Sequence, residues 1–305
     1  MVASEGSRQR VQSEWGVAAT TGLQEFLSWP CEAVIVVSPN YLHTAHGVAA
    51  LEAGKHVLVE KPLATTLEDC DRLLDAAARS GKVLAVGLEM RVFSLFSAIK
   101  AVLDSGEIGR PLHLKLDLWR RPYRAGAGGW KSDPDKLGSS VLEEPIHYLD
   151  LARWYLGEPT ALQAWANSRP GREVLWENLD VRLEFEGGAS ALVTRSIAAF
   201  EHHVALELVA EEGALRASWD GMMDVDLEPS VALTLHSERG TRVVEVPQQT
   251  GHAFDVPRQT AAFLEAIAGR AQPAATGQDG RAAVALCLAV EDSLRAGSRR
   301  IVLSG

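Results

Sequence analysis

Cysteine is scarce in this sequence. Only Cys31, Cys70 and Cys287 occur among 305 residues, and none of them lies in a C-x-x-C pair. Three widely spaced cysteines cannot form a disulfide framework, and the absence of close pairs argues against a zinc site or a redox motif. Cys70 and Cys287 fall on apolar faces of predicted helices, where a free thiol acts as a small hydrophobic side chain. The cysteine content therefore favours a reducing compartment, the cytoplasm.

Long apolar runs and an excess of positive charge are also absent. The longest apolar runs, 33–37 and 282–290, are far shorter than the roughly 20 residues that cross a bilayer. Thirty basic residues against forty acidic ones give a formal charge of -10, whereas a protein that binds phosphate backbones needs a basic surface. The first ten residues lack the apolar core and cleavage site of a signal peptide. We expect neither a membrane nor a nucleic-acid partner.

The first third of the chain alternates apolar strands with amphipathic helices. Residues 33–37 form a continuous apolar run, typical of a strand that is buried on both faces of a parallel sheet. Glycines that follow apolar periodic segments, and a capping box at Thr65-Thr66-Leu67-Glu68, mark helix ends. The pattern predicts strands at 33–37, 56–59 and 83–86 and helices at 43–53, 65–80 and 94–105. This half is therefore expected to be α/β.

The pattern changes after Gly109-Arg110-Pro111. Longer segments of alternating polarity are typical of antiparallel strands with one face in water. We expect strands at 113–119, 181–185, 191–197, 204–209 and 241–246, and helices at 145–155, 257–267 and 281–296. The sequence thus predicts two domains, an α/β domain over 1–109 and an α+β domain over 110–305 with a large, mainly antiparallel sheet.

Polar side chains follow two neighbouring strands of the predicted parallel sheet. The first strand runs into Ser38-Pro39-Asn40 with His43 beyond it, and the second runs into Glu60-Lys61-Pro62. Open α/β sheets bind ligands at the carboxyl ends of their strands, so both segments face one crevice. By itself, Glu60-Lys61-Pro62 is better explained as a solvated turn with an ordinary ion pair, and the neighbouring strand end is what favours a site.

A second group of polar residues surrounds a predicted helix start. Proline favours the first helical position, so Pro145 makes Glu144 the expected cap and places His147 in the first turn. The helix dipole then opposes protonation of His147, and Asp150 shares its face one turn later. The structural alternative is an acidic helix start with a half-buried His147 and an Asp150–Arg153 pair. A metal site at Glu143, Glu144, His147 and Asp150 is chemically conceivable but less favoured, and we assign no metal.

These segments together resemble one family, that of the glucose-fructose oxidoreductases, inositol dehydrogenases and rhizopine-catabolism proteins (Gfo/Idh/MocA). Ser38-Pro39-Asn40 with His43, and 53–63 with its Glu-Lys-Pro signature, are similar to the nicotinamide side of that family. Residues 106–109 resemble its domain junction, 130–138 its loop over the cofactor, and 143–150 its catalytic helix. The resemblance covers nearly the whole chain. It implies a nicotinamide-dependent oxidoreductase with a Rossmann-like first domain.

The resemblance also implies a role for each matching residue. Lys61 would hold the substrate oxygen, His147 would accept the hydroxyl proton, and Glu143 stands where the family usually has aspartate. Asp150 would hydrogen-bond a substrate hydroxyl, the substrate being a sugar, cyclitol or related polyol. The residues implied for NAD or NADP binding are Ser38, Pro39, Asn40, His43, Glu60, Lys61, Pro62 and Trp130. Trp130 directly follows the glycine-rich stretch 126–129, where a role as a loop anchor is equally plausible.

One part of the expected fold is missing from the sequence. It contains no G-x-G-x-x-G turn, the segment that normally receives the pyrophosphate, so about 30 residues of a complete Rossmann-like domain are absent. We therefore expect an N-terminally truncated domain in which strand 33–37 has an unpaired edge, and expect Met1 to be internal to a longer natural chain. The competing hypothesis is a non-catalytic binding or scaffolding protein. An open second sheet favours a homo-oligomer, a dimer or tetramer.

Overall fold

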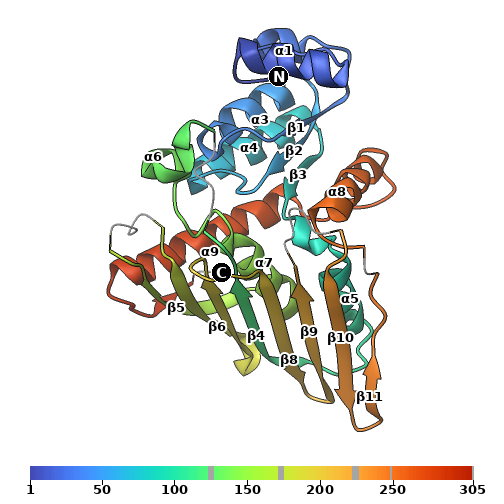
Figure 1. The fold of residues 1–305 in the computed structure, drawn as a ribbon, viewed down its shortest axis with the longest axis vertical. Coiled ribbons are helices and arrows are strands. Elements are labelled where there is room, and N and C mark those ends of the chain that lie inside the picture. Colours follow the sequence, from blue (N-terminus) through green and yellow to red (C-terminus); the bar gives the residue numbers. More distant parts are fainter. Residues whose placement is uncertain (123–126, 171–174, 222–226, 248, 304–305) are drawn as a thin grey trace.

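Two sheets organise the protein. Its computed structural model describes residues 1–122, 127–170, 175–221, 227–247 and 249–303. Within these ranges the strands form a small parallel sheet of order β1-β2-β3 and a large nine-stranded sheet of order β11-β10-β9-β8-β4-β7-β6-β5-β12 (Figure 1). Among the same residues, we find no helix whose length and apolar character would suit a bilayer span. The α/β and α+β expectations are confirmed.

The small sheet follows the predicted alternation of strands and helices. Its elements are β1 (Ala33–Val36), α3 (His43–Glu52), β2 (His56–Glu60), α4 (Leu67–Ser80) and β3 (Leu84–Gly87). All three strands run in parallel, so their carboxyl ends meet at one edge. Within the described residues β1 pairs with β2 alone, which confirms the predicted free edge, and Ile35 is 43% exposed there.

The large sheet is mixed rather than purely antiparallel. Its strands are β4 (Pro111–Trp119), β5 (Pro159–Asn167), β6 (Asn178–Phe185), β7 (Ser190–Ser196), β8 (His203–Ala210), β9 (Gly213–Asp220), β10 (Ser230–Ser237), β11 (Gly240–Val243) and β12 (Ile301–Val302). Neighbouring strands are antiparallel except β4 and β7, which run in the same direction. The prediction of a mainly antiparallel sheet is confirmed, although the sequence analysis missed β5, β9, β10 and β12.

Helices cover one face of the large sheet and return to the small one. The long helices after β3 are α5 (Ser94–Asp104), α7 (Pro145–Leu156), α8 (His252–Ile267) and α9 (Gly277–Arg295). α9 packs on β5 of the large sheet and on α4 and β3 of the small one (Figure 1). Phe263 of α8 is 3% exposed and packs against Leu58 and Ala85 of the small sheet. The last helices of the chain therefore complete the core of its first sheet.

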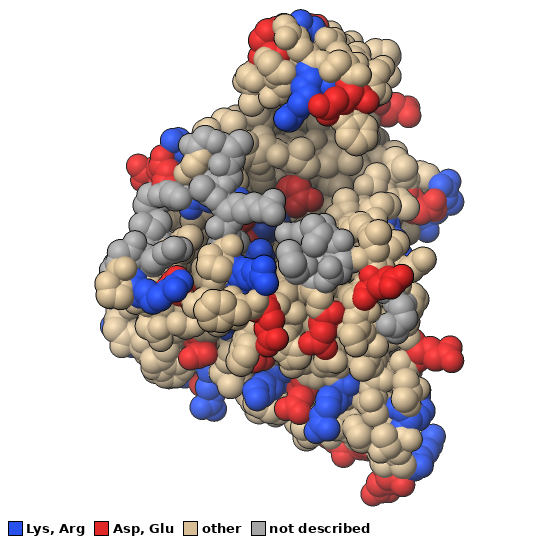
Figure 2. All heavy atoms as spheres, in the orientation of Figure 1, with Lys and Arg blue, Asp and Glu red and all other residues tan. Residues whose placement is uncertain are grey.

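Shorter elements connect these parts. They are α1 (Glu5–Trp15), α2 (Leu23–Leu27), η1 (Asn40–Leu42), η2 (Glu89–Arg91), η3 (Ala127–Ser132), α6 (Pro134–Leu137) and η4 (Glu186–Gly188). Figure 2 shows charges of both signs spread over one face of the molecule, with a hollow below the lobe that contains α1. Gly126, the first residue of the predicted glycine-rich loop, lies outside the described residues.

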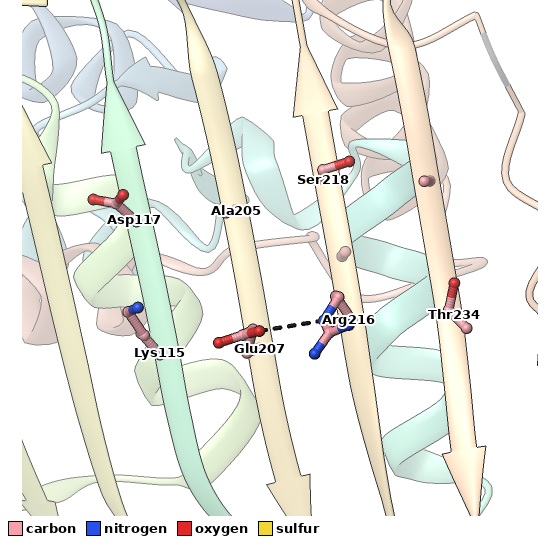
Figure 3. Close-up of a pocket in the computed structure, with 9 residues that line it drawn as sticks. Lys115, Asp117, Ala205, Glu207, Arg216, Ser218 and Thr234 are labelled. Atoms are coloured by element: carbon pink, nitrogen blue, oxygen red, sulfur yellow. Dashed lines mark hydrogen bonds and ion pairs between the residues drawn. The ribbon is translucent and has the colours of Figure 1, made fainter. Parts of the chain in front are cut away.

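The second face of the large sheet is polar, and no helix of the described ranges covers it. Along β4, Leu114 and Leu116 point toward the helices and are fully buried, whereas Lys115 and Asp117 point away from them. Figure 3 shows Lys115 and Asp117 beside the charged side chains of the neighbouring strands, on a face where Glu207 Oε1 and Arg216 Nε are 3.2 Å apart. This strict alternation is the predicted pattern of a sheet with one face in water.

Three helix starts differ from their predicted positions. α4 is capped by Thr66, whose hydroxyl accepts from the backbone N–H of Asp69, one residue later than the predicted box. α9 begins at Gly277 because Thr276 and Asp279 form a reciprocal capping box ahead of the predicted start. α8 begins at His252, before Pro257, because the Asp255 carboxylate accepts from the backbone N–H of Gly251 at 2.7 Å and holds the first turn.

Candidate active site

The loops after β1 and β2 are joined by one buried histidine. His43 is 1% exposed, and its Nδ1 and Nε2 lie 2.7 Å from the carbonyl oxygens of Pro62 and Ser38, respectively. Burial lowers the pKa of His43. Asn40 is also buried, and its side-chain amide donates to the carbonyl of Leu137, 3.2 Å away. Both residues thus fix the position of the loops that the sequence analysis placed in the cofactor site.

The helix start at Pro145 is confirmed. Pro145 is the first residue of α7, Glu144 is its N-cap, and the backbone N–H of His147 donates to the Glu144 carbonyl at 3.0 Å. The Glu144 side chain does not cap the helix but forms an ion pair with Arg120. His147 therefore lies in the first turn, as predicted, on the element that follows Glu143.

Lys61 and His147 come from different sheets and meet at this helix start. The Lys61 ammonium, directly after β2, donates to the backbone carbonyl of Glu143. The Glu143 carboxylate accepts from Lys131, a residue that the sequence analysis did not select. Burial favours neutral Glu143, but the charges of Lys61 and Lys131 outweigh it and lower its pKa. Three charged groups are thus held within one small volume.

His147 is suited to accept a proton. Its side chain is 4% exposed, and burial together with the nearby Lys61 charge lowers its pKa to about 4. The imidazole is therefore neutral near pH 7, the state a general base requires. The ring atom Nδ1 is buried and has no hydrogen-bond partner among the described residues. A substrate hydroxyl would satisfy this atom.

Asp150 is placed differently from the other predicted site residues. It is 1% exposed, and its Oδ2 and Oδ1 accept from Arg91 Nε and Nη2 at 2.7 and 2.8 Å. Oδ1 also accepts from Arg153 Nη1 at 3.0 Å, which is the pair that the structural alternative predicted. Guanidinium groups engage both oxygens in this structure and secure Asp150 on α7. Its role toward a substrate hydroxyl stays a prediction.

Two carboxylates lie beside the site, the half-buried Glu60 and the buried Glu89, and only Glu60 was predicted. Burial and the nearby charge of Glu89 raise the pKa of Glu60 to about 7. A Cβ at Gly87 would lie 2.8 Å from Glu60 Oε2, so the small sheet needs glycine there to admit this carboxylate. Glu89 was missed, although it follows β3 as Lys61 follows β2, and the same strand-end argument finds it.

Trp130 lies next to this cluster in η3. Its side chain is partly buried, and the Lys131 ammonium stands 5.5 Å from the centroid of its ring. A cation at this distance from an indole is attracted to its face. The contact places Trp130 beside the Lys131–Glu143 pair, and it is compatible with either role considered from the sequence.

The donor set fits the nicotinamide end of a dinucleotide. The residues at the carboxyl ends of β1 and β2 are fixed in place, and the Lys61 ammonium lies beside them. The buried Nδ1 of His147 has no hydrogen-bond partner among the described residues. Such an arrangement suits a nicotinamide ring and a reacting alcohol. We assign only this end, because the sequence contains no pyrophosphate-binding turn.

Comparison with known proteins agrees with this arrangement. A model described as "Oxidoreductase family, NAD-binding Rossmann fold" matches residues 2–88, and a "GFO/IDH/MocA C-terminal domain" model matches residues 96–216. The chain is 32% identical over 274 residues to inositol 2-dehydrogenase 2 of Saccharopolyspora erythraea, covering 88% of this chain and 75% of that protein. It is 29% identical over 293 residues to 1,5-anhydro-D-fructose reductase of Ensifer adhaerens, covering 94% and 85%.

Solved structures share the fold. A levoglucosan dehydrogenase in complex with NADH and levoglucosan has a TM-score of 0.83 at 22% identity, and the match covers 100% of this chain and 89% of that one. The aldose-aldose oxidoreductase of Caulobacter crescentus gives 0.83 at 21% identity, covering 99% and 90%. With both domain models and a relative above 30% identity in agreement, the chain belongs to the Gfo/Idh/MocA family of NAD-binding oxidoreductases.

Proposed function

We propose that this protein transfers hydride between a nicotinamide cofactor, NAD or NADP, and a secondary alcohol of a sugar, cyclitol or related polyol. The observation that carries the proposal is the convergence of Lys61 and His147 on one helix start, with the buried Nδ1 of His147 lacking a partner among the described residues. The relatives named above act on inositol and on an anhydrosugar, which supports the substrate class.

Each side chain has a defined task in this reaction. Lys61 donates a hydrogen bond to the substrate oxygen and stabilises the negative charge that develops as the proton leaves. His147, neutral at working pH, accepts that proton at Nδ1. Glu143 holds Lys61 through its carbonyl and Lys131 through its carboxylate. When bound, the nicotinamide ring supplies the acceptor for the hydride.

The cofactor is held from both loops of the small sheet. Ser38, Pro39, Asn40 and His43 form one wall, and Glu60, Lys61 and Pro62 form the other. His43 contacts carbonyls in both segments, so it keeps the distance between the walls fixed. We propose Trp130 as the cover over this site, because its ring lies beside Lys131 at the Glu143 side chain.

Replacing Lys61 by methionine tests the proposal. The variant keeps the length and apolar stem of the side chain but removes the cation, so kcat for polyol oxidation should fall by about 10²-fold or more. The assay follows NADH or NADPH absorbance with a panel of inositols, aldoses and anhydrosugars. The matched control is Lys82→Met, because Lys82 precedes β3 and lies at the opposite edge of the same sheet.

Cofactor titration separates this function from a non-catalytic binding role. Quenching of tryptophan fluorescence by NADH or NADPH at micromolar concentration, together with turnover of one substrate in the panel, supports the enzyme. A folded sample that neither responds to cofactor nor turns over any substrate would contradict it. Unchanged activity in Lys61→Met, with the control also unchanged, would refute the role given to Lys61.

Location, domain division and assembly belong to the same proposal. We place the protein in the cytoplasm, which is supported by three free cysteines in the described residues. We divide it at 109–110, just before β4 begins the large sheet. We also propose a homo-oligomer that pairs the helix-free face of that sheet, whose charges of both signs suit self-association. A monomeric mass by light scattering would count against this assembly.

A further inference from the structure

Three titratable side chains lead from the buried base to the surface. Glu89 Oε1 lies 3.9 Å from Nε2 of His147 and 3.1 Å from Nε2 of His252. The exposed fraction of the side chains rises along this path, from 4% for His147 and 10% for Glu89 to 36% for His252. The carboxylate therefore lies between an enclosed imidazole and one that reaches solvent.

Three separate elements bring these side chains together. Glu89 opens η2, two residues beyond the end of β3, while His147 is in the first turn of α7 and His252 begins α8. The Asp255 carboxylate holds the turn that carries His252. The ring of Phe93 meets the His252 ring edge-on, with centroids 5.8 Å apart, and limits its orientation. Both imidazoles are thus held against one carboxylate by the fold.

The reaction creates a need for such a path. Once His147 accepts a proton, it becomes a cation in an enclosed site, next to the Lys61 ammonium. Burial and the Lys61 charge already lower the pKa of His147 to about 4, so the protonated ring must release its proton quickly. With a side chain that is only 4% exposed, His147 has little direct contact with water.

The charges around Glu89 keep it able to accept that proton. Burial favours its neutral form, but the hydrogen bond from His252 and the charges of His147, His252 and Lys61 outweigh burial and lower its pKa. Glu60, at the end of β2, is a further carboxylate near Glu89, and burial together with the Glu89 charge raises its pKa to about 7. The two carboxylates are thus driven to opposite protonation states, Glu89 ionised and Glu60 protonated below about pH 7.

We propose that Glu89 is a positioning residue that orients His147 and carries its proton to His252 and on to solvent. This inference rests on the proposed function and adds the exit of the proton to it. For each alcohol oxidised, the hydride leaves carbon with two electrons for the nicotinamide, and the hydroxyl proton passes to His147. One proton then moves from His147 Nε2 to Glu89 Oε1, from Glu89 to Nε2 of His252 in the tautomer that carries its proton on Nδ1, and from Nδ1 of His252 to water.

The two gaps in this path differ in length. The 3.1 Å separation between Glu89 and His252 is a direct hydrogen bond, whereas 3.9 Å between Glu89 and His147 is too long for one. Transfer across the longer gap requires one bridging water or a tightening of the site around its substrate. A carboxylate with a purely structural role would need neither the bridging water nor the tightening. In that case the protonation of His147 would not depend on that of His252.

Histidine titration in the protein without ligands tests this coupling independently of turnover. Ring nitrogens are followed by NMR from about pH 2.5 to 9 in the wild type and in Glu89→Gln, with His252→Asn used to assign one signal. Removing a carboxylate near two imidazoles should lower the pKa of His252, and should lower that of His147 as well. The matched control, Glu265→Gln, removes an exposed carboxylate from α8 and should change neither.

Kinetics supply the second test. His252→Ala should lower kcat about tenfold at low buffer concentration, leave KM unchanged, and recover activity when imidazole is added as a soluble proton carrier. Glu89→Gln should lower kcat by about 10²-fold and resist rescue, because its carboxylate is enclosed.

These experiments test the proton path and the oxidoreductase function separately. Normal kcat in both variants, or histidine titrations that ignore Glu89→Gln, would overturn the proton path while leaving the oxidoreductase intact. A wild-type chain without turnover would instead refute the proposed function. In that case the titrations would still report whether Glu89 couples the two imidazoles.

Discussion

Removal of the Arg91 guanidinium should destabilise the protein through Asp150. Both side chains are buried, with 7% and 2% exposed, and two hydrogen bonds of 2.7 and 2.8 Å join them. Losing one partner of a buried ion pair costs about 3–5 kcal/mol, because the other charge remains enclosed without compensation. Arg153 still contacts Asp150 at 3.0 Å, so we expect the lower end of this range, about 3 kcal/mol, for Arg91→Met.

Thermal unfolding followed by circular dichroism measures this cost. Each kcal/mol shifts the Tm of a protein of this size by about 2–4 °C, so Arg91→Met should unfold about 6–12 °C below the wild type. The control is Arg79→Met, which breaks an exposed pair with Glu52 and should cost less than about 1 kcal/mol. Adding Asp150→Asn to Arg91→Met removes the stranded charge and should recover part of the loss.

The reasoning fails if Arg91→Met and Arg79→Met have the same Tm. That result would mean that Asp150 does not depend on Arg91 in solution and is available to a ligand. In that case Arg91→Met should change the KM for the polyol rather than the stability. The measurement therefore distinguishes a structural Asp150 from the substrate-binding role that the resemblance implied.

Three further predictions use the same protein preparations. The folded-state pKa of Glu60 is raised to about 7, so its contribution to stability is complete below the unfolded value of 4.5 and is lost as pH rises through 7. The Tm of Glu60→Gln should therefore rise relative to that of the wild type between about pH 5 and pH 8. A constant difference in Tm would contradict the shift. Burial raises the pKa of Cys70 to about 12 and that of Cys287 well above its usual value, so a thiol reagent should modify Cys31 first in the native chain; equal rates for all three would disagree. Phe263→Ala should cost about 3–5 kcal/mol by urea unfolding, and a loss below 1 kcal/mol would show that α8 does not cover the small sheet.

Local signals in the sequence predicted the elements that place the site. These signals act over a few residues, and the observed elements agree with them. They are the apolar run at 33–37, the glycine after α3 and the proline at the start of α7. β5, β9 and β10 were missed because their sequences mix polar and apolar residues, as loops do. Pairing with neighbouring strands, which the sequence does not show, makes them strands. Lys61 and His147 were found by resemblance and by strand-end reasoning, and their meeting depends on the fold of the 85 residues between them.

Contacts between distant segments could not be predicted. Lys131 pairs with Glu143 only because η3 folds over the start of α7, and nothing in the sequence around either residue indicates this. His252 joins Glu89 from 163 positions further along, in a turn that stands ahead of a proline and is held by Asp255. Contacts between residues so far apart depend on tertiary packing, and the periodicity of apolar residues in the sequence does not predict them.

The order in which this fold is completed has a consequence for its synthesis. Leu58 and Ala85 receive their cover from Phe263, and α9 closes over β3 only when residue 295 has been made. The apolar face of the first sheet therefore emerges from the ribosome long before its partner helices exist. During that interval the nascent chain exposes an apolar layer without its cover, so its yield in cells should respond to chaperone supply and to translation speed over the codons of α8 and α9.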